Sequence, residues 1–263
     1  MFYREHALPP ETAHAALCVW SFALEAGDPP LVQHKVPPDG TTNLLVALAP
    51  NGQALRRLVG PSVEAAHIPV AHGWSYAGLR LRPEAGEAVT GRAPGELIGG
   101  SHDLVGCEAI TADLELFLRA PEAPLAVDGI VAALGSVQTD PIVAPAVDVL
   151  IASGGIEPIG RLAEASSLGA RQFRRRFEAA TGLSPKQYAS VQRVRRALIL
   201  SLEGPSWAEV AADAGYADQA HLSRSVRSRF GAAPREVGGY IGGIRHRFVD
   251  HVLFVQDGAG CPG

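Results

Sequence analysis

The sequence predicts an α+β protein: a β-rich, barrel-like N-terminal domain with closing helices, followed by an all-α domain. Turn-bounded runs with alternating apolar residues fill much of the first 81 positions, and such runs predict strands. From residue 110 the apolar residues recur at three- and four-residue intervals, which is typical of helices. Beyond residue 160 one pattern of apolar residues, glycine and proline occurs twice. The all-α domain is therefore expected to contain two related units.

The composition is that of a globular protein with a buried core. Of the 263 residues, 47% are hydrophobic and 19% are charged, as in ordinary folded domains. The sequence has neither a run of eighteen apolar residues nor a basic segment followed by an apolar one, so we expect no membrane span and no secretory signal. The odd number and wide spacing of Cys18, Cys107 and Cys261 predict free thiols and a cytoplasmic location.

The net charge of −4 hides an uneven distribution. Residues 1–150 carry 8 basic and 17 acidic side chains, a net charge of −9, whereas residues 151–263 carry 15 and 10, a net charge of +5. A polyanion would therefore be attracted to the second part of the chain and repelled by the first.

Four segments predict strands in the N-terminal domain: residues 16–24, 42–48, 54–59 and 74–81. Two turn sequences separate some of them, Pro-Pro-Asp-Gly at residues 37–40 and Asn-Gly at residues 51–52. Asparagine, aspartate and glycine favour such turns because they tolerate the backbone angles that a tight reversal needs.

Two closing helices are expected after the strands. The stripe formed by Ile110, Leu114, Phe117 and Leu118 predicts the first; it would lie either on its own β-module or at a subunit interface, and the sequence leaves both open. Residues 125–134 predict the second helix. Glycines and prolines then punctuate residues 135–155, with a short helix expected at residues 146–152.

The tandem repeat has a constant offset of 49 residues. Phe173, Phe177, Gly182 and Pro185 of the first copy correspond to Leu222, Val226, Gly231 and Pro234 of the second. In each copy the apolar pair would pack one helix on its neighbour, the glycine would end that helix in the left-handed conformation, and the proline would begin the next. Capping boxes at residues 184–187 and 206–209 predict further helix starts. The helix over residues 185–201 would join the two copies rigidly.

Each copy is expected to be a helix-turn-helix unit whose second helix presents a polar, basic face to a major groove. Arginine can bridge O6 and N7 of guanine, and glutamine can pair with N6 and N7 of adenine. The candidate DNA-contacting residues are Ala170, Arg171, Gln172, Arg174 and Arg175 in the first unit, and Asp218, Gln219, Ala220, His221, Ser223, Arg224 and Arg227 in the second.

Residues 150–240 resemble the DNA-binding domain of the AraC/XylS family of bacterial regulators. In the first unit the matching residues are Leu162-Ala163-Glu164, Arg171, Phe173, Arg175, Phe177, Gly182-Leu183-Ser184-Pro185, Tyr188 and Arg195-Arg196-Ala197. In the second unit they are Trp207-Ala208-Glu209-Val210-Ala211, the segment from Gly215 to Arg224, and Phe230-Gly231-Ala232-Ala233-Pro234. The resemblance implies two three-helix units on one long helix, which read successive major-groove segments of double-stranded DNA as a transcription regulator.

The N-terminal part more distantly resembles the sensor-like domains of some family members, through residues 37–44 and 76–85. In many relatives such a domain binds a small effector and helps the protein to dimerise. The resemblance therefore implies a small-molecule effector and a homodimer, and a contact with RNA polymerase is a further expectation. Trp20, Phe22, Trp74 and Tyr76 lie on predicted strands and would either line the effector pocket or fill the core.

Two alternatives remain: a DNA-binding protein without an effector switch, and an enzyme-like, metal-binding N-terminal domain fused to the DNA reader. Alkyl-acceptor repair proteins with this type of DNA-binding domain need a four-cysteine zinc site, but only Cys18 and Cys107 lie upstream. The histidines at positions 34, 67, 72 and 102 are scattered, and no phosphate loop or nucleophile motif is present. We therefore expect no enzyme activity, no catalytic residue, no metal site and no cofactor.

The predicted organisation has four parts. They are an effector-binding and dimerisation domain at residues 1–135, a linker with a short helix at 136–155, the DNA-binding domain at 156–243 and a tail at 244–263. In the tail, Phe248-Val249 and residues 252–255 are expected to add a strand to some surface.

Overall fold

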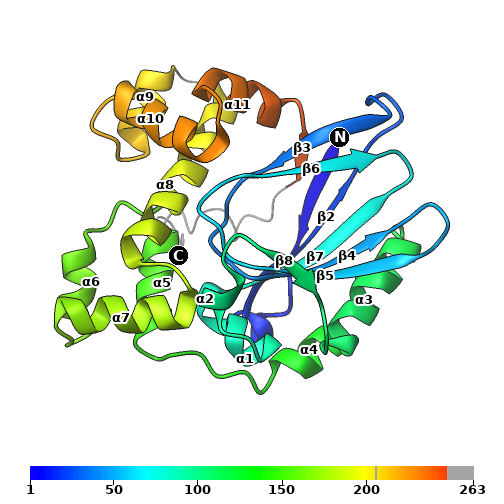
Figure 1. Ribbon diagram of the computed structural model, residues 1–263, viewed down its shortest axis with the longest axis horizontal. Coiled ribbons are helices and arrows are strands. Elements are labelled where there is room, and N and C mark those ends of the chain that lie inside the picture. The colour runs from blue at the N-terminus through cyan, green and yellow to red at the C-terminus, as the bar shows by residue number, and fades with distance from the viewer. Residues whose placement is uncertain (205, 248–263) are drawn as a thin grey trace, which may run out of the picture.

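The computed structural model describes residues 1–204 and 206–247 (Figure 1). In this part of the chain, a module of strands and helices comes first. A region of helices follows it, and one last strand, β9, follows these helices. The predicted α+β class is therefore confirmed. The strand predicted at residues 248–255 and Cys261 lie outside the described residues.

The main sheet contains seven strands in the linear order β8-β5-β4-β7-β2-β1-β9. Their bounds are β1 Phe2–His6, β2 Ala16–Ala23, β4 Asn43–Leu48, β5 Ala54–Val59, β7 Ser75–Leu81, β8 Ser101–Asp103 and β9 Arg245–Arg247. Neighbouring strands pair antiparallel except β9, which follows the helical region and pairs in parallel with β1. A separate ribbon pairs β3 (Leu31–Val36) with β6 (Ala66–Ala71). The barrel-like module is thus an open sheet accompanied by a two-stranded ribbon.

Helices α3 (Glu108–Arg119) and α4 (Asp128–Leu134) cover one face of the sheet (Figure 1). Ile110 and Leu114 are fully buried, and Phe117 and Leu118 are at most 9% exposed. They share one hydrophobic cluster with Val19 and other sheet residues. The stripe predicted from the sequence is therefore core, and it is not available as a subunit interface.

Short helical segments complete this module. They are η1 (Pro10–Thr12), η2 (Pro83–Ala85), α1 (Gly86–Thr90) and α2 (Pro94–Leu97). Three of the four begin with a proline at the first or second helical position, where its missing N–H costs no hydrogen bond. Of these segments, η2, α1 and α2 contact the helical region.

The helical region contains two units joined by α8 (Figure 1). Its helices are α5 Val143–Ala152, α6 Ile159–Ala165, α7 Ala170–Thr181, α8 Pro185–Leu200, η3 Ser201–Glu203, α9 Trp207–Asp213, α10 Gln219–Phe230 and α11 Pro234–Gly242. Helices α5, α6 and α7 share one hydrophobic cluster with the first part of α8, and α9, α10 and α11 share another with its second part. The two predicted units are thus two separately packed bodies on one long helix.

The module and the helical region make direct polar contacts at several places. The Tyr240 hydroxyl of α11 lies 2.6 Å from Nδ1 of His34 and accepts the backbone N–H of Lys35 at 3.1 Å. Arg82 forms an ion pair with Asp148 of α5, and Asp140 forms one with Arg176 of α7. Together with the β1–β9 pairing, these contacts hold the two parts in one arrangement.

Among the residues that the structure describes, none of the helices combines the length and apolar character needed to cross a bilayer.

Candidate nucleic-acid interface

The second helix of each unit has the start and end that the repeat predicts. Gly182 and Gly231 adopt φ angles of 77° and 65° directly after α7 and α10. A residue with a side chain is strained in this left-handed conformation, whereas glycine is not. Pro185 and Pro234 then begin α8 and α11, and the capping boxes of Ser184 and Ser206 are both formed. The local backbone predicted from the repeat is confirmed.

Each of these helices buries one face in its own unit. Phe173 and Phe177 of α7 are fully buried, as are Leu222 and Val226 of α10. We call α7 and α10 the reading helices, because their opposite faces carry the candidate DNA contacts. Burial of two large apolar side chains fixes which face remains outward.

The predicted DNA-contacting residues lie on these outward faces. The exposed ones are Ala170, Arg171, Gln172, Arg174, Arg175, Asp218, Gln219, Ala220, His221, Arg224 and Arg227, and Ser223 is half-buried. Arg174 is paired with Glu178 at 3.1 Å. In the described part of the chain, Arg171, Arg175, Arg224 and Arg227 form no such ion pair. The four guanidinium groups are therefore open to phosphate or guanine acceptors.

Two of the predicted contacts have a structural role in α10. Asp218 is its N-cap, and its carboxylate accepts the backbone N–H of His221 at 2.6 Å. The His221 ring packs edge-on against Tyr216, with 5.1 Å between the ring centroids. These contacts hold the first turn of α10, where Gln219 and Ala220 lie, in a defined orientation.

Replacing Asp218 with alanine should lower the free energy of unfolding by about 1 kcal/mol, because the N-cap hydrogen bond is lost. Replacing it with asparagine should leave stability nearly unchanged, since asparagine caps equally well. Removal of the negative charge should also leave DNA affinity equal or higher. Thermal unfolding and a DNA titration of both variants check this. Weaker DNA binding by Asp218→Asn, at unchanged stability, would instead make Asp218 a direct base contact.

The four aromatic residues predicted to line an effector pocket gather around the face of the sheet away from α3. Trp20 covers Gly78, where a Cβ atom would lie 2.5 Å from the indole ring, and its Nε1 donates to Asn43 at 3.1 Å. Phe22 stacks on His34 of the ribbon with 4.1 Å between centroids, and Tyr76 lies beside Phe22 and Trp74. Phe22, Tyr76 and Trp74 thus pack in a row that reaches the ribbon at His34, whereas Trp20 packs on the sheet and beside Tyr3.

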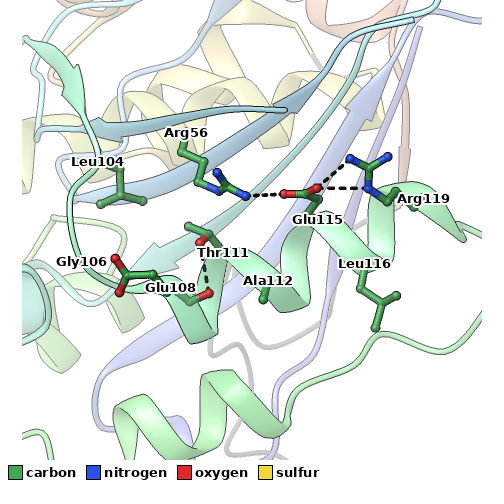
Figure 2. A pocket seen from close by; sticks show the side chains of 9 residues that line it. All are labelled: Arg56, Leu104, Gly106, Glu108, Thr111, Ala112, Glu115, Leu116 and Arg119. Carbon is green, nitrogen blue, oxygen red and sulfur yellow. Dashed lines mark hydrogen bonds and ion pairs between the residues drawn. The ribbon is translucent and has the colours of Figure 1, made fainter. Parts of the chain in front are cut away.

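A cleft of about 600 Å³ lies on the other side of the module, along α3 (Figure 2). The residues that line it are Arg56, Leu104, Gly106, Glu108, Thr111, Ala112, Glu115, Leu116 and Arg119. Figure 2 shows Glu115 between the two guanidinium groups, with which it forms ion pairs of 2.6 Å and 2.7 Å. These ion pairs and hydrogen bonds from both arginines hold the pKa of Glu115 below its usual value. The cleft has the size of a small-molecule site, and the sequence prediction missed it.

A buried ion-pair cluster is a second feature that the sequence prediction missed. The Arg80 guanidinium on β7 donates to Glu5 at 2.8 Å, to Asp39 at 3.2 Å and to the Tyr3 hydroxyl at 3.1 Å. The side chains of Arg80 and Glu5 are 9% and 1% exposed. Burial raises the pKa of Cys18 to about 12, although Arg80 opposes this shift, so the thiol stays neutral. Arg80 lies on the same face of β7 as Gly78 and Tyr76, opposite the apolar residues of this strand. An arginine in the alternating pattern of a central strand was the sequence signal that could have indicated the cluster.

The histidines considered as metal ligands occupy separate places: His34 in β3, His67 in β6, His72 after β6 and His102 in β8. Within residues 1–204 and 206–247, histidine, cysteine and acidic side chains form no group of three or more placed to hold a metal ion.

Comparison with known proteins places the helical region in a family. Residues 162–238 match the family model described as a helix-turn-helix domain. Among curated proteins, none is similar enough to count as a relative.

Solved structures give several matches to the helical region. The DNA-binding domain of AdpA, a global transcriptional factor solved with a target DNA, is 30% identical; the match covers 38% of this chain and 92% of that domain, with a TM-score of 0.35. A transcriptional regulator with an AraC-type DNA-binding domain from Chromobacterium violaceum is 24% identical over 38% of this chain and 90% of its own, with a TM-score of 0.34.

Matches to structures of ToxT extend over most of the chain. ToxT from Vibrio cholerae is 10% identical, and the match covers 86% of this chain and 97% of ToxT, with a TM-score of 0.45. Because the helix-turn-helix family model spans both units, residues 162–238 of this chain form a helix-turn-helix domain of that family.

Proposed function

We propose that this chain is a DNA-binding transcription regulator, that it binds its operator through the outward faces of both reading helices, and that a small molecule bound to the N-terminal module controls the affinity. One observation carries the DNA part of the proposal. Both reading helices bury their apolar faces and expose polar first turns, with Arg171 at the start of α7 and Gln219 at the start of α10. The N-terminal residues of a recognition helix are those that contact base edges.

The domain limits predicted from the sequence, 1–135, 136–155 and 156–243, remain part of the proposal. The cluster around the sheet ends near Val137, and the next begins at Val143, which supports a division within the predicted linker. A homodimer and a contact with RNA polymerase also remain part of it. The stripe on α3 gives the dimer no support, because it is buried in the core.

The cleft along α3 supports the effector part of the proposal. It is large enough for a small molecule, and its arginines and carboxylates would favour a polar ligand with both donors and acceptors. The aromatic group of Trp20, Phe22, Trp74 and Tyr76 remains the alternative location. A ligand at either place can change DNA affinity only by binding two states of the protein with different affinity.

The effector prediction is tested by filling the cleft. Fractionated metabolite extract of the host should change the operator affinity of the full chain by about five- to 150-fold, the usual range of coupling between two sites. Ala112→Trp should abolish the change, because Ala112 is exposed and lines the cleft. Ala109→Trp is the matched control, since Ala109 is exposed on the same helix but does not line the cleft.

The outcomes of this titration separate the alternatives. An effect that survives in Ala112→Trp would move the effector site away from α3. A full chain whose operator affinity no fraction changes would leave a DNA-binding protein without an effector switch.

A further inference from the structure

The N-terminal module touches both reading helices at the same place, their C-terminal ends. The backbone N–H of Ala65, in the loop between β5 and β6, donates to the carbonyl of Arg229 in the last turn of α10 at 2.9 Å. At the other unit, α2 packs on α7. A Cβ atom at Gly182, the residue that ends α7, would lie 2.9 Å from the carbonyl carbon of Pro94. The module thus reaches the last turn of one reading helix and the cap of the other.

The two contacting segments form one connected piece. The backbone N–H of Gly60 donates to the carbonyl of Gly100 at 3.0 Å, and that of Gly99 donates to the carbonyl of Pro61 at 2.9 Å. A Cβ atom at Gly60 would lie 1.8 Å from the carbonyl oxygen of Leu97, so the two backbones are in direct contact. We call residues 60–65 and 94–100 the bridge.

The bridge also joins the hydrophobic clusters of the two units. Val63 packs against the cluster of the first unit, and Ala65 packs against that of the second. At the second contact Arg229 itself links α10 to α8, because its Nη2 donates to the Ser190 hydroxyl at 2.6 Å. The bridge therefore engages both units and holds α10 at a residue that is already fixed to the long helix.

The contact leaves the DNA-facing side of the reading helices open. Arg171 and Gln219, at their N-terminal ends, are exposed, whereas the bridge meets the C-terminal ends. It therefore positions the helices and does not cover their candidate base contacts. The two reading helices must enter successive major-groove segments. Their relative orientation therefore determines the spacing between the two DNA elements, that is, the two groups of base pairs that the helices contact.

We propose that the bridge is a specificity determinant: it sets the distance and angle between the two reading helices and so selects operators with one spacing between their two elements. This inference rests on DNA reading by both helices and does not depend on an effector. A single long helix can bend, and a second connection between the units restricts that bending.

The test uses the full chain and duplex DNA selected by that chain from a random library. The measured quantity is the ratio of two dissociation constants, for the selected duplex with one base pair inserted between its elements and for the selected duplex itself. Ala65→Pro removes the N–H that bonds to Arg229, whereas Ala65→Gly keeps it and is the matched control. Val63→Ala removes only side-chain packing and serves as the second variant if Ala65→Pro does not fold.

In Ala65→Pro and Val63→Ala the ratio should fall at least tenfold, because the inserted duplex is accepted almost as well as the original. In Ala65→Gly it should stay within about twofold of the wild-type ratio. An unchanged ratio in folded Ala65→Pro, or in Val63→Ala if only that variant folds, overturns the proposal. If the wild-type chain enriches no sequence at all, DNA reading itself fails, and that result is distinguishable from failure of the bridge.

Discussion

Replacing Arg80 with methionine should lower the free energy of unfolding by about 3–5 kcal/mol, the usual cost of removing one partner of a buried ion pair. The Glu5 carboxylate, 1% exposed, would lose its cationic partner, and Asp39 would lose a hydrogen-bond donor. The large effect comes from the uncompensated charge that remains in the interior.

The measurement is denaturant unfolding followed by tryptophan fluorescence in a Trp207→Phe background, which leaves Trp20 and Trp74 of the N-terminal module as reporters. Arg57→Met is the matched control, because the Arg57–Asp103 pair is exposed on both sides and is worth at most about 1 kcal/mol. Adding Glu5→Gln to Arg80→Met should recover part of the loss. If Arg80→Met cost no more than Arg57→Met, the cluster would not stabilise the module.

Replacing Arg171 or Gln219 with alanine should weaken binding to the selected duplex by about 1–3 kcal/mol each. Both side chains are exposed at the first turn of a reading helix, where they can reach base edges. Each variant should also relax sequence preference at one or two base pairs, because the lost contacts carry sequence information.

Arg175 and Arg227 lie farther along the reading helices, and their alanine variants should weaken binding to all sequences alike. They should also reduce the salt dependence of binding by about one phosphate contact. Arg57→Ala, on β5 of the N-terminal module and outside the cleft, is the control expected to leave affinity unchanged. Unaltered affinity and selectivity in Arg171→Ala would show that α7 does not read bases as assigned.

The helical region could be predicted well from the sequence because its signals are local. A glycine that needs a left-handed backbone, a proline at a helix start and a capping box each act within a few residues. Two copies at an offset of 49 residues reinforced one another. The strands β2, β4, β5 and β7 were likewise predicted, since each has an apolar pattern of its own.

The ribbon of β3 and β6 was not predicted, because the sequences of its two strands give only a weak strand signal. Strand β6 contains Pro69, which lowers strand propensity, and in β3 only His34 is buried. Its stability comes from pairing with a distant partner and from the stacking of His34 on Phe22. Such contacts leave no periodic mark in the sequence.

The same reason applies to the Arg80 cluster, the cleft along α3 and the bridge. Arg80 lies 75 residues from Glu5 in the chain, and Ala65 meets Arg229 only after both parts have folded. A sequence pattern shows which face of an element is apolar, but not which distant loop will meet it. The outward faces of the reading helices could be predicted, because the apolar pattern of each helix shows which face is buried and therefore which face stays exposed.

The two helix-turn-helix units of one chain are expected to read two adjacent segments of DNA. A hydroxyl-radical footprint of the full chain on duplex DNA selected from a random library tests this expectation most directly. We expect two protected segments about one helical turn apart on one side of the duplex, with protection of one segment reduced by Arg171→Ala and of the other by Gln219→Ala. Protection of a single short segment, or failure of both variants to alter either segment, would contradict this expectation.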